Sequence, residues 1–167
     1  ALALADALRP LADPLQMQQS AMRLLGTRLG AARAYYYKVE REEAGYVHVM
    51  EADWFHRAGM PSLVGGYPQA AFGSPWFERL AAGEVLAVDD VSAVLGTEEL
   101  ARYRAIDIHA FIGVPLIKAG RYVGGVAVMH TQPRHWSEGE VALVETTAER
   151  TWYAVERAGL EQALRQQ

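Results

Sequence analysis

The chain has 167 residues, of which 51% are hydrophobic and 22% charged, and its 16 Lys and Arg against 20 Asp and Glu give a formal net charge of −4. This length fits one domain, and the acidic balance argues against nucleic acid as a partner. The absence of cysteine excludes disulfides, thiolate nucleophiles and cysteine-held metal sites, and the absence of any apolar run of roughly 18 residues predicts a cytoplasmic protein without a membrane span.

The first 30 residues predict two helices separated by a break. Pro10 and Pro14 exclude one straight helix, because proline lacks a backbone donor. Asp13 followed by Pro14 is typical of a helix start, and Gly30 can cap the end of that helix. Apolar side chains recur at alternating spacings of four and three residues, which is the helical period, and Gln18 fills the one gap in the series: Leu4, Leu8, Leu11, Leu15, Met22, Leu25 and Leu29.

Residues 33–40 and 45–54 predict a β-hairpin, because both segments are rich in aromatic and β-branched residues and flank a polar turn. The second strand does not show which of its faces is buried. One face would carry Tyr46, His48, Met50 and Ala52, and the other Val47, Val49, Glu51 and Asp53.

Residues 54–73 are dense in glycine and proline and also contain large aromatic side chains. A segment of this kind predicts an ordered flap rather than a disordered linker. A short helix over 76–82, a strand over 84–89 and a helix capped by Thr97 that runs to about Ala105 are expected next.

The last third predicts a hairpin and a long helix. Two nearly continuous apolar segments fold about Ala119-Gly120, which indicates central strands covered on both faces. Ser137 and Glu140 form a capping box, so the last helix begins at about Glu138 and continues to the chain end. Together, these predicted elements indicate an α+β domain: an antiparallel sheet with the terminal helices on one face and irregular segments over the other.

Motifs in the second half of the chain follow a specific order and spacing. A strand closes on Val114-Pro115-Leu116, a turn holds Gly120, a second strand opens on Val123-Gly124, and 133–137 lead through Glu140 into the last helix. This order resembles a GAF domain of the kind found in bacterial sensor histidine kinases. The resemblance covers residues 84–156 and extends weakly over the whole chain. It implies a sheet of about six strands, with a ligand pocket on one face and helices on the other.

The resemblance also implies a division of the chain. We expect a helical lead-in over 1–12, the GAF domain over 13–158 and the start of a C-terminal signalling helix over 159–167, in a piece of a longer polypeptide. Two series spaced by seven residues indicate weak heptads in the last helix: Val141, Ala148 and Val155, and Val144, Thr151 and Ala158. Leu160 and Leu164 favour a homodimer through the terminal helices that is linked to an output domain, whereas the same pattern also fits a helix facing its own sheet.

The pocket that the resemblance implies would have an apolar wall and a few polar groups. The candidate ligand-binding residues are Trp54, Phe55, Phe72, Trp76, Phe77, Val88, Asp89, Tyr103, Asp107, Ile108, His109, Phe111 and His130. The alternative is that these aromatic side chains simply pack the flap on the sheet, which would give a ligand-free dimerisation and relay module. No catalytic residue is predicted, since no nucleophile, base and orienting group can be named.

The sequence lacks the motifs that would indicate a metal or a covalently attached chromophore as the ligand. The five histidines show no HxxxH or HxH spacing, so no metal site is predicted. Phytochrome GAF domains hold a linear tetrapyrrole, but their D-I-P motif and the cysteine for covalent attachment are missing here, and His130 is only a partial echo of their histidine. We therefore expect no evident cofactor and exclude covalent bilin, with a non-covalent chromophore as a further alternative.

The residues that two other branches of the family require are also missing. The branch that reduces methionine sulfoxide needs cysteines, and the N-K-x-x-x-F-x-x-x-D-E pattern of cyclic-nucleotide binders does not occur. The prediction is a non-catalytic sensory domain of a two-component signal-transduction protein that reversibly binds an unidentified small molecule.

Overall fold

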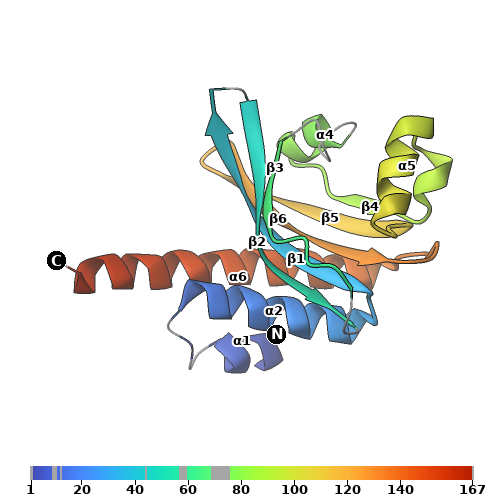
Figure 1. Ribbon diagram of the computed structural model, residues 1–167. Coiled ribbons are helices and arrows are strands. Elements are labelled where there is room, and N and C mark those ends of the chain that lie inside the picture. The colour runs from blue at the N-terminus through green and yellow to red at the C-terminus, as the bar shows by residue number, and fades with distance from the viewer. Residues whose placement is uncertain are drawn as a thin grey trace.

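The centre of the molecule is a six-stranded sheet, seen in a computed structural model that describes residues 2–8, 11, 13–43, 45–56, 60–68 and 76–166. All neighbouring strands are antiparallel, in the order β3-β2-β1-β6-β5-β4 (Figure 1), which confirms the predicted fold class. The strands are β1 (Arg33–Glu42), β2 (Gly45–Phe55), β3 (Gly65–Pro68), β4 (Leu86–Val88), β5 (Ala110–Lys118) and β6 (Arg121–His130).

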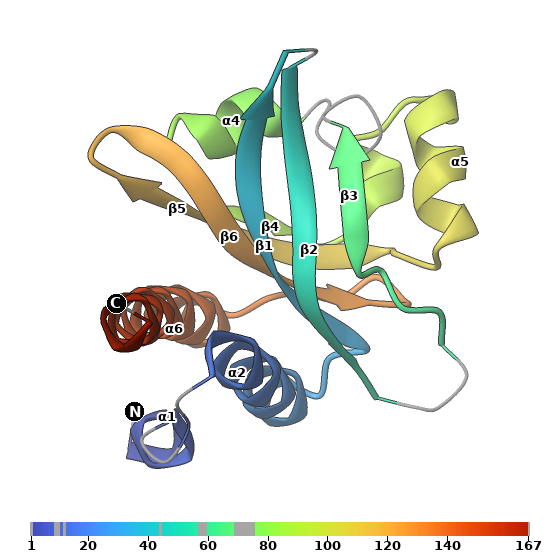
Figure 2. The same cartoon turned by 60° about the vertical axis from the view of Figure 1, so that its left-hand side comes forward.

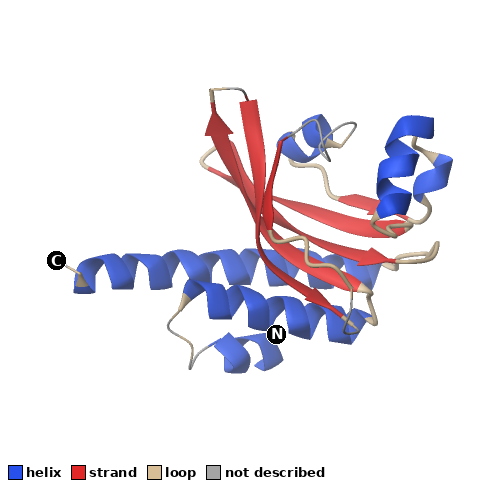
Figure 3. Ribbon diagram, in the orientation of Figure 1, coloured by secondary structure: helices blue, strands red, loops and turns tan. Residues whose placement is uncertain are grey.

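Helices cover the two faces of the sheet unequally. The long helices α2 (Pro14–Leu29) and α6 (Glu138–Arg165) lie side by side on one face, with α1 (Leu2–Leu8) beneath them (Figure 2). The short helices α4 (Phe77–Ala81) and α5 (Thr97–Ala105) and the 3-10 turn η1 (Val91–Ala93) lie over the opposite face (Figure 3). We call these the helix face and the cavity face.

Local sequence explains most helix boundaries. Glu140 N–H donates to Ser137 Oγ at 3.1 Å and Ser137 N–H donates to Glu140 Oε1 at 2.9 Å, so the predicted capping box is present. Gly30 ends α2 in the left-handed conformation with φ of 60°. Thr97 is not the cap of α5, because Gly96 occupies that position with an extended backbone and Thr97 is already helical. Pro10 lies outside the described residues.

The buried strands alternate between two separate cores. In β5, Ile112 and Leu116 join the apolar core under α2 and α6, whereas Phe111 joins a smaller cluster on the cavity face. Ala110 to Leu116 of β5 and Gly124 to Met129 of β6 are buried without interruption, as predicted for central strands.

An irregularity in β2 answers the question of its buried face. The register with β1 shifts so that Tyr36 pairs with Ala52 and Tyr37 pairs with Met50, which leaves Glu51 as an extra residue. Such a bulge moves the following side chains to the other face of the strand. His48 and Met50 therefore line the cavity face, whereas Ala52, which pairs with the core residue Tyr36, and Trp54 face the helices.

The helices that the structure describes include none with the length and apolarity of a membrane-spanning segment.

Candidate functional site

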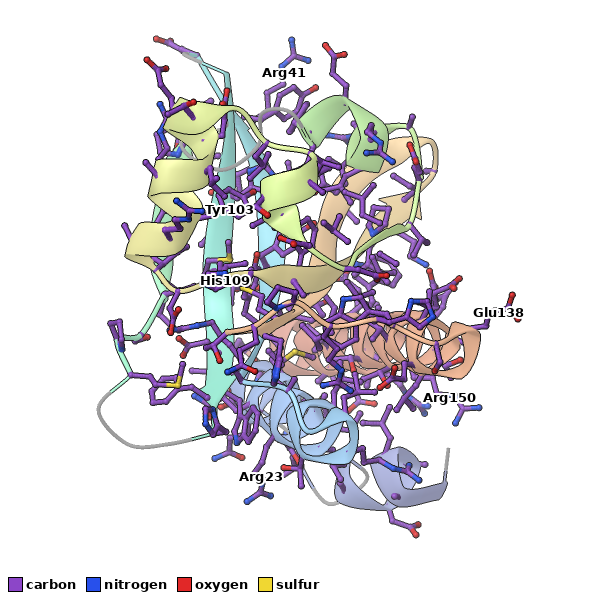
Figure 4. The ribbon with its side chains drawn as sticks, turned by 90° about the vertical axis from the view of Figure 1, so that its right-hand side faces the viewer. Arg23, Arg41, Tyr103, His109, Glu138 and Arg150 are labelled. Carbon is purple, nitrogen blue, oxygen red and sulfur yellow. The ribbon has the colours of Figure 1, made fainter. Side chains whose placement is uncertain are left out.

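A cavity of about 60 Å³ lies on the cavity face, between the sheet and the elements that cover it. Four central strands supply its floor and α4, α5 and the segment between α5 and β5 supply its cover. Figure 4 shows Tyr103 of α5 lying next to the strands. The lining residues are Tyr35, Tyr37, His48, Met50, Trp76, Leu80, Tyr103, Ile108, Phe111, Gly113, Ala127 and Met129.

Three aromatic rings form one wall of the cavity. The ring of Trp76 meets Phe111 edge-on with centroids 5.3 Å apart, and Tyr103 lies 6.4 Å from Phe111. All three side chains are buried. Burial raises the pKa of the Tyr103 hydroxyl. The wall is thus apolar with its few polar atoms neutral.

A chain of polar side chains forms the other wall. The hydroxyls of Tyr37 and Tyr122 lie 2.6 Å apart, and the Tyr122 hydroxyl lies 3.4 Å from His48 Nε2. The His48 ring also meets Phe77 edge-on at 5.7 Å. Burial lowers the pKa of His48 to about 4, so this imidazole is neutral at pH 7. Burial likewise raises the pKa values of Tyr37 and Tyr122.

The structure brings four of the sequence-predicted residues together at this cavity: Trp76, Tyr103, Ile108 and Phe111. Two others lie beside it. Phe77 packs on the ring of His48 from α4 without lining the cavity, and Val88 of the edge strand β4 packs on the same apolar cluster. Phe72 lies outside the described residues.

Two predicted aromatic residues lie away from the cavity. Trp54 follows the bulge of β2 and faces α2, where a Cβ on Gly26 would come within 2.2 Å of its ring. Phe55 ends β2 with its ring 5.7 Å from the guanidinium carbon of Arg33. These positions correct the expectation that the aromatic side chains of 54–73 share one pocket.

The predicted polar residues also lie elsewhere. Asp89 accepts a hydrogen bond from the backbone N–H of Trp136 and lies 2.9 Å from Nδ1 of His135, so it ties β4 to the segment before α6. Oδ1 of Asp107 and Nε2 of His109 lie 3.3 Å apart after α5. None of these three side chains lines the cavity described here.

The alternation of side chains along β6 places His130 outside the cavity. Ala127 and Met129 of β6 point into the cavity, so His130 points to the helix face, where it lines a shallow depression with Trp54 and His56. Within the described part of the chain, no three His, Asp or Glu side chains come together as metal ligands.

Eight lining residues were missed by the sequence reasoning: Tyr35, Tyr37, His48, Met50, Leu80, Gly113, Ala127 and Met129. The alternation of Tyr35 and Tyr37 along one strand was a usable signal, because both side chains must share a face. His48 and Met50 carried no such signal, since the bulge that decides their face is a property of strand pairing.

Comparison with known proteins identifies the architecture. A family model described as the GAF domain matches residues 13–155. None of the curated proteins gives a significant match.

Solved structures resemble the whole chain. The far-red absorbing dark state of JSC1_58120g3 with bound biliverdin IXa has a TM-score of 0.80 and 17% identity, covering 95% of this chain and 98% of the other. The phycocyanobilin-bound GAF domain from a cyanobacterial phytochrome has a TM-score of 0.79 and 17% identity, covering 96% and 93%. The blue-light absorbing form of the PixJ GAF domain of Thermosynechococcus elongatus has a TM-score of 0.74 and 20% identity, covering 92% and 91%.

These structures correct the expectation on cofactors. Two of them hold a bilin, biliverdin in one and phycocyanobilin in the other. The expectation that no cofactor is evident and that covalent bilin is excluded is therefore wrong. The missing cysteine concerns only a thioether bond from this chain, and a tetrapyrrole can be held by non-covalent contacts as well.

Proposed function

We propose that this chain, which belongs to the GAF domain family, is a sensory domain that reversibly binds a small molecule in the cavity under α4 and α5. The observation that carries the proposal is the composition of the cavity wall. Aromatic and aliphatic side chains form most of it and a single polar chain of His48, Tyr122 and Tyr37 borders it, which is the usual make-up of a small-molecule site.

The size of the cavity sets a condition on binding. Its volume of about 60 Å³ is smaller than the roughly 300 Å³ of ordinary ligand pockets. A ligand of drug size would therefore bind a conformation in which the cover has moved away from the sheet. Trp76 beside α4 and Tyr103 of α5 rest on Phe111, so these two elements would move. Such a ligand stabilises the open conformation and shifts the population toward it.

The signal would leave the domain through α6. Strand β5 lines the cavity with Phe111 and ends at Lys118, whose Nζ pairs with Glu149 of α6. The same Nζ lies 4.8 Å and 4.7 Å from the ring centroids of Trp152 and Tyr153. A displacement of β5 would therefore shift α6 directly through these contacts of Lys118.

The remaining parts of the proposal concern the parent protein. We propose that α6 continues into an output domain, that two copies pair through their terminal helices and that the domain has no catalytic activity of its own. The exposed Leu160 and Leu164 on α6 support the pairing. The similarity of residues 148–164 to the C-terminal helix of GAF domains in bacterial sensor histidine kinases supports a histidine kinase of a two-component system as the parent protein.

Two other functions have an observation in their favour. The small cavity volume favours a ligand-free dimerisation and relay module, in which the aromatic wall simply fills the space under the cover. The similarity to structures that hold biliverdin or phycocyanobilin favours non-covalent binding of a bilin, for which the cover would have to open.

One set of measurements separates these functions. Native mass spectrometry of the freshly purified protein should show a non-covalent adduct that is lost on denaturation, and incubation with biliverdin should produce a protein-bound absorption band if the ligand is a bilin. Absence of both would favour the relay module. The thermal stabilisation by the bound molecule should decrease in Phe111→Ala and should persist in Phe55→Ala, whose ring lies outside the cavity.

A further inference from the structure

We infer that His48 is a hydrogen-bond donor to the ligand of the cavity, and that the part of a ligand that enters the cavity is uncharged and carries an acceptor such as a carbonyl oxygen. The inference rests on the proposed function, because it names the chemistry of the molecule that the same cavity would bind. The inference depends on which atoms donate and which accept in the hydrogen bonds of His48, Tyr122 and Tyr37.

His48 has one ring nitrogen with a partner and one without. The side chain is only 6% exposed, and its Nε2 lies 3.4 Å from the hydroxyl of Tyr122. Its Nδ1 is buried and has no hydrogen-bond partner among the described residues. A buried polar atom without a partner costs about 1–3 kcal/mol, so a ligand that supplies a partner to Nδ1 gains from it, as it would at Nε1 of Trp76 on the aromatic wall.

The tyrosine hydroxyls decide which nitrogen carries the proton. Tyr37 is 4% exposed, and the Tyr122 oxygen is the one acceptor for its hydroxyl proton among the described residues. If Tyr122 donated to Tyr37 instead, the Tyr37 proton would be buried without an acceptor. The arrangement that satisfies both hydroxyls has Tyr37 donating to Tyr122 and Tyr122 donating to His48 Nε2.

This arrangement places the remaining proton of His48 on Nδ1. A neutral imidazole has one N–H, and its other nitrogen is an acceptor. Because Nε2 accepts from Tyr122, Nδ1 must carry the hydrogen. His48 lines the cavity, so this buried N–H becomes a donor for a ligand that binds once the cover has moved away from the sheet. A ligand group that can only donate would meet this N–H without forming a bond, which selects against it.

The surroundings of His48 require that the ligand portion be uncharged. The described residues that line the cavity include no Lys, Arg, Asp or Glu. A charged group would lose its hydration there without gaining an opposite charge. The rings of Trp76, Tyr103 and Phe111 add flat apolar surface, which suits an unsaturated, planar group next to the acceptor.

The proton position can be measured without any ligand. Long-range 1H–15N NMR of the histidine side chains at pH 7 should show His48 protonated on Nδ1, with the signal assigned by its loss in His48→Phe. Tyr122→Phe removes the donor to Nε2 and should reduce the preference for this tautomer. Protonation of Nε2 in the unaltered protein would overturn the inference.

The acceptor requirement can be measured with two probes of the same shape. Acetophenone has a carbonyl oxygen where α-methylstyrene has a methylene group, so the two differ in one acceptor. We expect acetophenone to bind about fivefold more tightly, which corresponds to a net hydrogen bond of about 1 kcal/mol. The preference should vanish in His48→Phe and should remain in His130→Phe, which changes a histidine on the helix face.

The outcomes distinguish the inference from the proposed function. Equal affinity of the two probes for the unaltered protein, or a preference for acetophenone that survives in His48→Phe, would overturn the inference and leave ligand binding in place. Failure of both probes to bind would count against the cavity as a small-molecule site, and the inference would fall with it.

Discussion

The two faces of the sheet are filled in different ways. On the helix face, side chains such as Ile112, Leu116 and Val144 are completely buried in one continuous apolar core. On the cavity face, aromatic rings and short helices leave a space of about 60 Å³, which the polar chain of His48, Tyr122 and Tyr37 borders. A sheet stabilised from one side can thus carry a loosely filled, mostly apolar site with a polar border on the other.

The largest expected difference between the faces comes from one substitution made on each. Leu116→Ala on the helix face should lower the free energy of unfolding by about 3–4 kcal/mol, because the completely buried site leaves a new cavity. Leu80→Ala on α4 should cost about 1 kcal/mol, since Leu80 is half-buried and already borders a space. Urea denaturation of both variants measures the two values. Equal losses would show that the cavity face is as tightly packed as the helix face.

A second difference should appear on acidification. Burial lowers the pKa of His48 to about 4, whereas an unfolded histidine has a pKa of about 6.5. The unfolded chain therefore binds the additional proton between these pH values, so stability is full above pH 6.5 and is lost as the pH falls toward 4. The gap between the two pKa values corresponds to about 3 kcal/mol.

Denaturation across this pH range tests the His48 contribution. His48→Phe should remove the corresponding part of the pH dependence. His135→Asn changes an exposed histidine whose pKa is raised by its hydrogen bond to Asp89, and it serves as the control. The same acid dependence in both variants would place the titrating group elsewhere.

A smaller effect is expected at the start of α6, which belongs to the helix face. Ser137→Ala removes the side-chain acceptor for the N–H of Glu140 and should cost about 1 kcal/mol. Thermal unfolding measures the loss. The His48 tautomer should not change, because the capping box does not touch the cavity face, and a changed His48 signal would show that the two faces are coupled.

The smallest effect on stability is expected from adding a methyl group to the cavity. A Cβ at Gly113 would meet the Phe111 ring at 3.7 Å and Leu80 at 3.8 Å, which are ordinary contacts. Gly113→Ala should therefore change the stability by less than about 0.5 kcal/mol. It should nevertheless weaken acetophenone binding, measured by calorimetry, and unchanged binding would move the ligand away from this part of the wall.

Local sequence was sufficient for much of the fold. The hairpin about Ala119-Gly120, the long helix after Ser137 and the break before Pro14 were all predicted, because turn residues, caps and apolar periodicity act over a few neighbouring positions. The motif order from Val114 to Glu140 was sufficient to predict the GAF family, which the family model confirms.

For the cavity, only residues of its cover and of strand β5 were predicted from the sequence. Trp76, Tyr103, Ile108 and Phe111 were placed correctly at the cavity, whereas Trp54 and His130 lie on the helix face. For His130 the reason is alternation along β6, and for Trp54 it is the bulge at Glu51. Both depend on the register between strands, which composition and periodicity do not contain.

By itself the sequence determined the α+β class, the positions of the terminal helices and the absence of cysteine chemistry, since these follow from short-range patterns and from composition. Only the tertiary structure decided that Tyr37 and Tyr122, 85 residues apart, meet His48 beside one cavity. The physical reason is that a polar chain of this kind is assembled by strand pairing across β2, β1 and β6.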